Sequence, residues 1–411
     1  MKLAMLKAMH TYVALLGRNP ALSRAELQAR LLDLSHARLM GEYLFFQTSV
    51  DIDQAFLDTL GGTILIAKKL SDGAMSLEDL PALLATELKG TGRKAIFSLR
   101  LIGINPRTGH DLFRKCKGNL KKNNVPSRYV GNEREPAKTV QLHDEGLLDP
   151  KKGCELTVIV ETGHVWIGRT VAAQNIKSYS KRDMEKPVRD TMVGLLPPKL
   201  AQLLLNFGEY LAKQKNPKLK DKLTVLDPFC GTGVVPMEAM LRGFDVLGSD
   251  VSLKAVNGTT KNVEWLRKEY KVAKKDVDCE IWKQDATKPF ELKKLPDMIV
   301  TEGTLGPALK SRPNLKDAET FMKDSDALTL SFLTNCKATL PGVPVVMTLP
   351  VWYAQKRFIT LKNVWANAEK LGYKAVMPAE TAGSMPGRTS ILYRRDDQFV
   401  GREIVLLLPQ S

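Results

Sequence analysis

The chain has 411 residues, a formal net charge of +16 and a pI of about 9.5, and 44% of its residues are hydrophobic. These values exclude a fibrous or largely disordered chain and are typical of two or three globular domains. The positive charge favours a polyanionic partner such as nucleic acid, although a generally lysine-rich surface would produce the same excess. The five cysteines are scattered without a C-x-x-C pair, which argues against a zinc site and favours a reducing compartment.

No segment contains the ~18 uninterrupted apolar residues that a membrane span requires. Lys7 and His10 interrupt the apolar start of the chain, and no small-residue cleavage site follows it. We therefore expect a cytoplasmic protein without a signal peptide and without membrane contact. The sequence does not determine the oligomeric state, so both a monomer and a chain that needs an activator subunit stay open.

Residues 1–75 have the pattern of a small α/β sandwich. Apolar runs with aromatic residues at 11–17, 42–47 and 63–67 predict strands. Ser23 and Glu26 have the spacing of a capping box, which predicts a helix that begins after Ser23 and continues to about Leu34. Residues 52–60 predict a second helix.

Residues 76–176 have the pattern of a second α/β domain. We predict helices at 78–88 and 110–123, and strands at 95–104, 128–130, 156–161 and 164–170. The helix at 110–123 is basic and is a solvated face or a set of phosphate contacts. Its basic residues, with one that follows it, are Arg114, Lys115, Lys117, Lys121, Lys122 and Arg128.

Residues 177–222 have the pattern of a connector. Its first part, 179–199, is polar and contains prolines. Pro197 and Pro198 then open a predicted helix at 199–211, because proline is tolerated in a first helical turn. A basic run at 213–222 ends the connection.

Residues 223–233, Leu-Thr-Val-Leu-Asp-Pro-Phe-Cys-Gly-Thr-Gly, are the most informative stretch, because they predict a buried strand that ends in an acid and a glycine turn. With a helix predicted at 234–242, this is how an open α/β sheet builds a nucleotide pocket at its carboxyl edge. Gly231 and Gly233 allow a tight turn and the close approach of a ligand. Pro236 replaces the third glycine of a dinucleotide fingerprint, and Asp227 would repel a pyrophosphate.

Two further acids follow predicted strands, Asp250 after 244–250 and Asp285 after a short apolar run at 280–284. Asp250 lies 17 residues after Gly233, about where a ribose-binding carboxylate belongs. Three acids in this order suggest S-adenosylmethionine, with Asp227 on the methionine amine, Asp250 on the ribose and Asp285 on the adenine. The alternative is that they only cap helices. The remaining predicted pocket residues are Pro228, Phe229 and Ala286.

Residues 179–201 closely resemble the connector of the THUMP-domain tRNA guanosine-N2-methyltransferases, and residues 227–233 match the cofactor loop of that family. Residues 393–404 resemble its C-terminal strands. The resemblance extends over the whole chain and implies an α/β fold, with a Rossmann-like class I methyltransferase sheet whose last strand is reversed. It implies four domains: ferredoxin-like at 1–75, THUMP-like and RNA-binding at 76–176, a connector at 177–222, and the methyltransferase at 223–411.

The resemblance also implies S-adenosylmethionine as the methyl donor and the exocyclic N2 amine of a guanosine in tRNA as the acceptor. THUMP domains are thought to hold the acceptor end of tRNA. On that basis the helix at 110–123 and Arg128 become candidates for phosphate contacts, together with Arg182 in the connector.

One motif departs from the family. Amino methyltransferases of this kind usually carry Asp/Asn-Pro-Pro-Tyr/Phe after the fourth strand, where the acid accepts the N–H groups of the amine and the ring stacks on the extruded base. Here the strand at 297–300 is followed by Thr301, Glu302, Gly303 and Thr304.

The acidic position falls on Thr301 or on Glu302, and the prolines and the ring are missing. We predict Glu302 as the amine acceptor, with Thr301 and Thr304 beside it. Trp352 or Tyr353, after the predicted strand at 343–349, is a candidate for the missing ring, although both are also typical of core or rim packing.

This departure leaves two other functions open. The first is a tRNA-binding pseudoenzyme or scaffold, which would keep cofactor and RNA binding but lose the chemistry. The second is a DNA amino-methyltransferase, which would also be expected to carry the missing aromatic motif and would not explain the THUMP-like front half.

Overall fold

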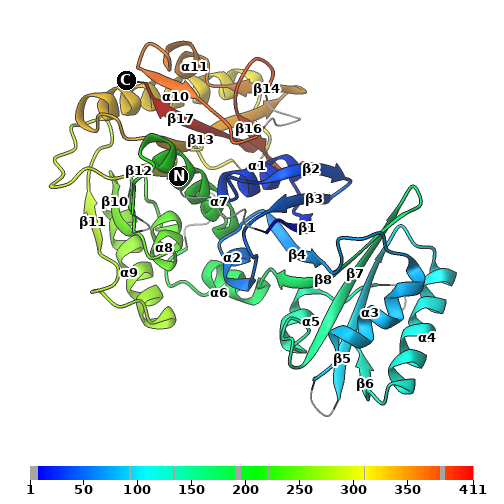
Figure 1. Cartoon of the computed structure of the whole chain (residues 1–411). Coiled ribbons are helices and arrows are strands. Elements are labelled where there is room, and N and C mark those ends of the chain that lie inside the picture. Colours follow the sequence, from blue (N-terminus) through cyan, green and yellow to red (C-terminus); the bar gives the residue numbers. More distant parts are fainter. Residues whose placement is uncertain are drawn as a thin grey trace, which may run out of the picture. The chain divides into compact units, whose positions relative to one another are not determined.

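The computed structural model describes residues 8–91, 94–132, 135–189, 196–220, 222–309, 311–379 and 385–410. The chain divides into two compact units (Figure 1). Unit 1 comprises residues 1–20, 31–59 and 63–179, and unit 2 comprises residues 21–30, 60–62 and 180–411. Two short segments from the N-terminal region therefore belong to the unit that carries the glycine turn.

Unit 1 is built on one sheet of eight strands in the order β2-β3-β1-β4-β8-β7-β5-β6. The antiparallel pairing of β4 with β8 joins the regions 1–75 and 76–176 in this single sheet. The strands are β1 (His10–Leu16), β2 (Ser35–Met40), β3 (Tyr43–Thr48), β4 (Thr63–Lys69), β5 (Ala95–Ile102), β6 (Ser127–Tyr129), β7 (Gly153–Glu161) and β8 (His164–Ala173).

The basic helix α4 (Pro106–Lys122) begins four residues earlier than predicted. Asn105 caps it by accepting a hydrogen bond from the Thr108 backbone N at 2.9 Å, and proline occupies the first turn. Its apolar stripe of Leu112, Cys116 and Leu120 is buried against the sheet. The other helices that begin in unit 1 are α2 (Gln54–Leu57), η1 (Leu77–Asp79), α3 (Leu80–Glu87), α5 (Thr139–Asp144) and α6 (Ile176–Met184).

Helix α1 (Pro20–Arg30) shows that the predicted capping box is wrong. The helix begins at Pro20, so Ser23 and Glu26 lie inside it, where residues three apart share one face. That face meets the loop at 60–62, where Ser23 Oγ donates to the Gly62 carbonyl at 2.7 Å. Glu26 accepts hydrogen bonds from the backbone N of Gly61 and Gly62, both at 2.8 Å.

Unit 2 is built on a sheet of nine strands with the path β11-β10-β9-β12-β13-β17-β15, to which β14 and β16 add at β13 and β17. The strands β9 to β13 run parallel, and β17 is antiparallel to β13. This order confirms the predicted Rossmann-like class I methyltransferase sheet with a reversed last strand. The strands are β9 (Thr224–Asp227), β10 (Asp245–Asp250), β11 (Cys279–Lys283), β12 (Met298–Glu302), β13 (Val345–Ala354), β14 (Arg357–Thr360), β15 (Tyr373–Ala375), β16 (Ile391–Tyr393) and β17 (Val400–Pro409).

Helices cover both faces of this sheet and form two cores (Figure 1). One core contains α7 (Pro198–Lys215), α8 (Val234–Leu241) and α9 (Leu253–Tyr270), and the other contains α10 (Leu315–Thr339) and α11 (Asn363–Asn367). The predicted helix at 199–211 corresponds to α7, whose apolar residues are buried in the first core. Most of the predicted connector therefore belongs to unit 2. No helix in the described ranges is long and apolar enough to cross a membrane.

Gly208 lets α7 approach β12 closely. A Cβ at this position would lie 2.6 Å from Cγ2 of Val300 and 2.8 Å from Sδ of Met298. Both contacts are shorter than a carbon atom tolerates, so a larger residue would displace the helix or the strand. Because β12 ends in the Thr301–Glu302 pair, this packing positions the candidate site.

We therefore expect Gly208→Ala to lower the melting temperature. Gly118→Ala is the matched control, because Gly118 is also helical but is exposed in α4 with no atom within 4 Å of a new Cβ. There the greater helix propensity of alanine should stabilise by about 0.5–1 kcal/mol. Thermal unfolding followed by circular dichroism measures both effects, and a gain in stability for both variants would contradict the close approach.

Candidate active site at the carboxyl edge of the nine-stranded sheet

The glycine turn after β9 has the conformation that its sequence predicts. Gly231 and Gly233 have φ values of +53° and +83°, which glycine adopts readily and other residues do not. A Cβ on Gly233 would lie 2.8 Å from Cγ2 of Thr259 on α9, whereas a Cβ on Gly231 would meet nothing closer than 3.9 Å. Gly233 therefore serves the packing of α9, and Gly231 leaves space in which a ligand can reach the backbone.

Asp250, at the end of β10, is tied to this turn. One carboxylate oxygen accepts a hydrogen bond from the Gly231 backbone N at 3.0 Å, and the other accepts one from the Ser252 backbone N at 2.8 Å. Each carboxylate oxygen has a second lone pair, so Asp250 can still accept from a bound hydroxyl group.

Two residues of α9 that the sequence analysis missed also hold the turn. Thr259 Oγ1 donates to the Gly231 carbonyl at 2.8 Å. Asn262 Nδ2 donates to the carbonyls of Thr232 (2.8 Å) and Val188 (2.9 Å). Both side chains are buried. Buried polar groups need hydrogen-bond partners, and the carbonyls of the turn supply them here.

Asp227, at the end of β9, is only 3% exposed. Its Oδ1 accepts hydrogen bonds from Thr301 Oγ1 at 2.6 Å and from the Phe229 backbone N at 3.3 Å. The pKa of Asp227 is raised to about 7, chiefly by burial; the nearby charges of Asp250 and Glu302 add to the shift, and the hydrogen bond from the Thr301 hydroxyl opposes it. Three of the predicted residues are thus close enough to interact electrostatically.

The structure corrects the prediction for Thr301. Its side chain is fully buried and its hydroxyl is bonded to Asp227, so it orients that acid and does not reach a substrate. Glu302, the next residue, takes the acidic position at the strand end. Thr304 Oγ1 accepts a hydrogen bond from the Gly306 backbone N at 3.1 Å and so shapes the loop.

Glu302 forms an ion pair with Arg402 of β17. β13 lies between β12 and β17, so Arg402 reaches across the neighbouring strand. The Glu302 side chain is 15% exposed and that of Arg402 is 4% exposed. Burial raises the pKa of Glu302, and the Arg402 guanidinium opposes this shift. The sequence analysis did not identify Arg402.

Asp285 follows β11 on a loop held by α10. Its Oδ1 accepts hydrogen bonds from the backbone N and the Oγ1 of Thr287, at 2.9 and 2.8 Å, and these bonds lower its pKa. Asn335 Nδ2 donates to the carbonyls of Ala286 (2.9 Å) and Lys288 (2.5 Å). The loop that carries Asp285 and Ala286 is therefore fixed to the second core.

The structure distinguishes the two candidate rings. Trp352 is fully buried beside Phe321, with 6.3 Å between the ring centroids, and it also lies against Gly306. It is a core residue and cannot stack on a substrate. Tyr353, the next residue on β13, is half-buried.

The predicted RNA contacts divide into two groups. Arg114, Lys115 and Arg128 are exposed, where they form ion pairs with Asp111, Glu78 and Glu145, and Lys121 and Lys122 are exposed in the last turn of α4. Lys117 Nζ donates to the Ser127 carbonyl at 3.3 Å. The prediction that Arg182 contacts RNA is wrong. Its side chain is buried and its Nε donates to Glu238 on α8 at 2.6 Å, so its guanidinium stabilises unit 2.

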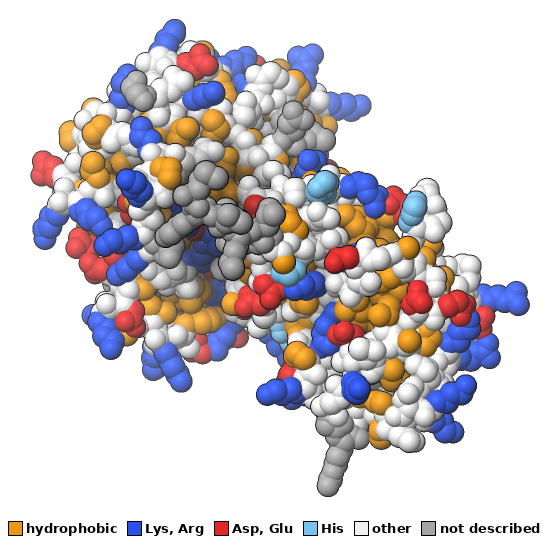
Figure 2. Space-filling view, viewed as in Figure 1, with side chains coloured by type: hydrophobic (Ala, Val, Ile, Leu, Met, Phe, Trp, Pro, Cys, Tyr) orange, Lys and Arg blue, Asp and Glu red, His pale blue; other side chains and the backbone are white. Residues whose placement is uncertain are grey.

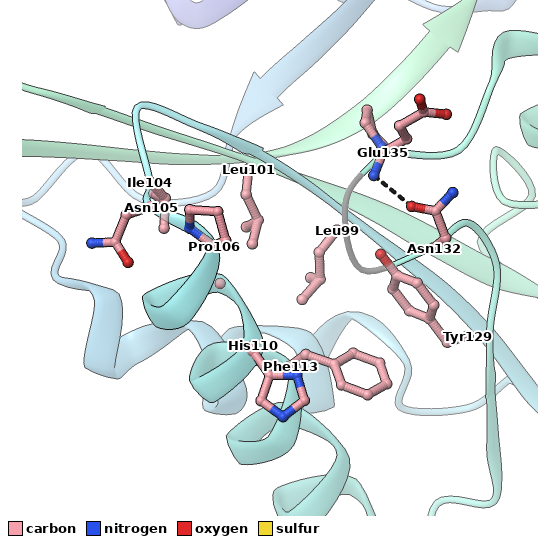
Figure 3. A pocket seen from close by; sticks show the side chains of 12 residues that line it. Leu99, Leu101, Ile104, Asn105, Pro106, His110, Phe113, Tyr129, Asn132 and Glu135 are labelled. Carbon is pink, nitrogen blue, oxygen red and sulfur yellow. Dashed lines mark hydrogen bonds between the residues drawn. The ribbon is translucent and has the colours of Figure 1, made fainter.

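A cleft of about 330 Å³ lies beside α4 in unit 1 (Figure 3). Phe113 and Tyr129 form part of its wall, with 4.9 Å between their ring centroids. His110, Asn132 and Glu135 contribute its polar groups. These residues come from α4, β6 and the loop after β6, so no local pattern could have identified the cleft.

The raised pKa of Asp227 makes stability depend on pH. The folded pKa of about 7 lies above the ordinary value of 3.8, so the folded state binds the proton more tightly. The resulting stabilisation is fully present only below the ordinary pKa of 3.8 and is lost as the pH rises from there through 7. Asp227→Asn removes the charge, and its amide oxygen can still accept from Thr301.

We expect this variant to gain stability over the wild type as the pH rises from about 4 to 7 and to keep a constant advantage above 7, so that the advantage grows by about 2 kcal/mol of unfolding free energy between pH 5.5 and pH 8. Thermal unfolding across this pH range measures the difference, with the exposed Asp276→Asn as control. A difference in stability between the variant and the wild type that does not change with pH would contradict a raised pKa for Asp227.

The comparisons with known proteins begin with curated sequences. No family model matches the chain. It is 30% identical over 158 residues to the tRNA (guanine(10)-N2)-dimethyltransferase of Methanothermobacter thermautotrophicus, a match that covers 38% of this chain and 39% of the relative. It is 32% identical over 123 residues to a protein of Methanothermococcus thermolithotrophicus named as a probable tRNA (guanine(10)-N2)-dimethyltransferase, covering 29% of this chain and 67% of that relative.

Among solved structures, TrmN from Thermus thermophilus is 16% identical with a TM-score of 0.49, and the match covers 97% of this chain and 100% of that one. A possible methylase from Clostridium difficile is 12% identical with a TM-score of 0.47, and the match covers 98% and 99% of the two chains. The fold assignment rests on the strand order of the nine-stranded sheet, and the sequence matches decide the family. The chain belongs to the family of tRNA (guanine-N2)-methyltransferases.

Proposed function

We propose that this protein is an S-adenosylmethionine-dependent tRNA methyltransferase that modifies the N2 amine of a guanosine. The observation that carries the proposal is the convergence of Asp227, Asp250 and Glu302 around a glycine turn at the point where the strand order reverses. Open α/β sheets bind their ligands at this place. The matched segment spans 39% of the first curated relative, and that relative's name supplies the substrate class.

The acids around the turn suit a cationic cofactor. Within the described ranges, no lysine or arginine forms an ion pair with Asp227, Asp250 or Asp285. Uncompensated carboxylates favour a ligand with an ammonium and a sulfonium group. The open space at Gly231 allows such a ligand to contact the backbone.

We assign the predicted roles on this basis. Asp227 and the turn, which includes Pro228 and Phe229, would hold the methionine end. Asp250 would accept from the ribose hydroxyls, and the loop with Asp285 and Ala286 would hold the adenine. When bound, S-adenosylmethionine supplies the methyl group.

Glu302 would accept an N–H of the guanosine amine. This amine is a poor nucleophile because its lone pair is conjugated with the ring, so directing the lone pair at the methyl group lowers the barrier. Burial raises the pKa of Glu302, and the Arg402 guanidinium opposes this shift, since an adjacent cation favours the carboxylate. A fixed anion at the end of β12 would thus do the work of the acid in the usual motif.

The tRNA partner is supported by charge. The chain carries a net charge of +16, and Lys and Arg side chains are spread over the visible face, with Asp and Glu between them (Figure 2). The exposed basic residues of α4 and Arg128 are the proposed phosphate contacts. The five cysteines are all free thiols, which suits the predicted cytoplasmic location. A monomer and a complex with an activator subunit both stay compatible with these observations.

A tRNA-binding scaffold without catalytic activity is the second candidate. Gly303 and Thr304 stand where the proline pair is expected, and Glu302 is already paired with Arg402. Both features favour a site that binds its ligands without transferring the methyl group.

Incubation of unmodified tRNA with labelled S-adenosylmethionine, followed by nucleoside analysis, decides between the two functions. We expect label in N2-methylguanosine, and we expect Glu302→Ala to lower the rate about 10²-fold or more because the amine loses its acceptor. Glu319→Ala, an exposed acid on α10, is the control. No label in the wild type, with both ligands still bound, would establish the scaffold.

Asp250→Ala should abolish cofactor binding, because it removes both the ribose acceptor and the partner of the Gly231 backbone N. The affinity for tRNA should stay nearly unchanged. Calorimetry with S-adenosylmethionine and gel shifts with tRNA measure the two affinities, with the exposed Asp276→Ala as control. Equal loss of both ligands would contradict this division of roles.

A further inference from the structure

Three segments of unit 2 converge on Tyr353, near the end of β13. The guanidinium carbon of Arg312, from the segment before α10, lies 5.1 Å from the Tyr353 ring centroid. The guanidinium carbon of Arg394, from the loop after β16, lies 4.6 Å from the same centroid. Phe358 of β14 is the cross-strand partner of Tyr353, with 5.2 Å between their ring centroids.

This cluster is a built feature of the hairpin that β13 and β14 form. Its two-residue turn places Gln355 and Lys356 at φ values of +45° and +62°, a conformation that favours glycine. Arg394 is fixed by its own loop, because its Nε donates to the Gln398 carbonyl at 3.2 Å and its Nη2 to the Asp396 carbonyl at 3.2 Å. The guanidinium therefore keeps its place over the ring.

The cluster presents both a ring and positive charge to solvent. Phe358 is 44% exposed, although its ring is apolar, and Arg312 is also exposed. The guanidinium groups of Arg312 and Arg394 lie over the Tyr353 ring, so Tyr353 supports them, and Phe358 is the exposed ring of the cluster. In the three segments the described charged residues are Arg312, Lys356, Arg357, Arg394 and Arg395, against Asp396 and Asp397.

The position of the cluster relates it to the candidate active site. Glu302 is in register with Thr348 of β13, and Tyr353 follows five residues farther along that strand. At the usual rise per residue, Tyr353 lies about 16 Å beyond Glu302. Because the two strands are parallel, the cluster lies beyond the same carboxyl edge of the sheet at which the acids gather.

We propose that a single-stranded segment of the RNA substrate binds to this hairpin platform, defined as Arg312, Tyr353, Phe358 and Arg394. The inference rests on the proposed function, since it deepens the description of the same substrate. Exposed aromatic rings with flanking arginines bind single strands, because bases stack on the rings and phosphates approach the cations. The bases of duplex RNA are stacked on one another, so their faces are not available to an exposed protein ring.

The affinity of the full-length protein for a fluorescein-labelled single-stranded RNA, measured by anisotropy, tests the platform. We expect Phe358→Ser to weaken binding about tenfold because one stacked base is lost. Arg312→Gln should reduce the slope of log affinity against log salt by about one, because one phosphate contact is lost. Phe358→Tyr should restore the affinity.

Arg357→Gln and Arg395→Gln are the matched controls. Arg357 precedes Phe358 on the hairpin and Arg395 follows Arg394, yet neither is part of the platform. Equal weakening in the controls would show that net charge alone binds the RNA, and would overturn the proposal. So would an unchanged affinity in Phe358→Ser with normal cofactor binding, or an equal loss for duplex RNA.

The same variants separate this inference from the proposed function. If single-stranded RNA binds as expected but the wild type does not methylate tRNA, the proposed enzymatic function is wrong and the platform proposal stands. If the wild type and Phe358→Ser both methylate tRNA with the same KM, the proposed enzymatic function stands and the platform proposal is wrong.

Discussion

The carboxyl edge of the nine-stranded sheet depends on one hydrogen bond, from Thr301 Oγ1 on β12 to Asp227 Oδ1 on β9. It joins the ends of two neighbouring strands where the strand order reverses, and it orients the acid that the glycine turn follows. A buried carboxyl group without a donor would be strongly unfavourable, so the hydroxyl makes the placement tolerable. The cofactor pocket and the end of β12 that carries Glu302 are thereby fixed to each other.

The two acids of this edge that lie deepest are stabilised in different ways. Glu302 has the guanidinium of Arg402, whereas Asp227 has only neutral donors. Neutral donors leave the negative charge of Asp227 uncompensated, which destabilises the folded protein at alkaline pH but leaves the charge available to a cation. The difference matches the proposed roles, since one acid would meet a positively charged cofactor and the other a neutral amine. The uncompensated charge of Asp227 lowers the stability of the folded protein at the position where a bound cationic ligand is expected to raise it.

Strand β9, the glycine turn and helix α8 could be predicted because a strand, an acid, a glycine turn and a helix follow one another within residues 223–242. The same reasoning failed at Ser23 and Glu26, because a spacing of three residues occurs both in a capping box and on one face of a helix interior. The pair of Glu302 and Arg402 could not be predicted, since its members lie 100 residues apart and meet only through the reversed pairing of β17 with β13. The platform around Tyr353 has the same origin in three distant segments.

Helix α1 makes the chain of unit 2 discontinuous, with consequences for how the protein is synthesised. Asn206 Nδ2 donates to the Glu26 carboxylate across 180 residues of sequence, and the two lie in the same unit. During synthesis α1 emerges long before α7, so its apolar face must wait for a partner while the strands of unit 1 assemble. Such long-range contacts slow folding and expose transient apolar surface. Unit 2 cannot complete its core until the first and last thirds of the polypeptide have met.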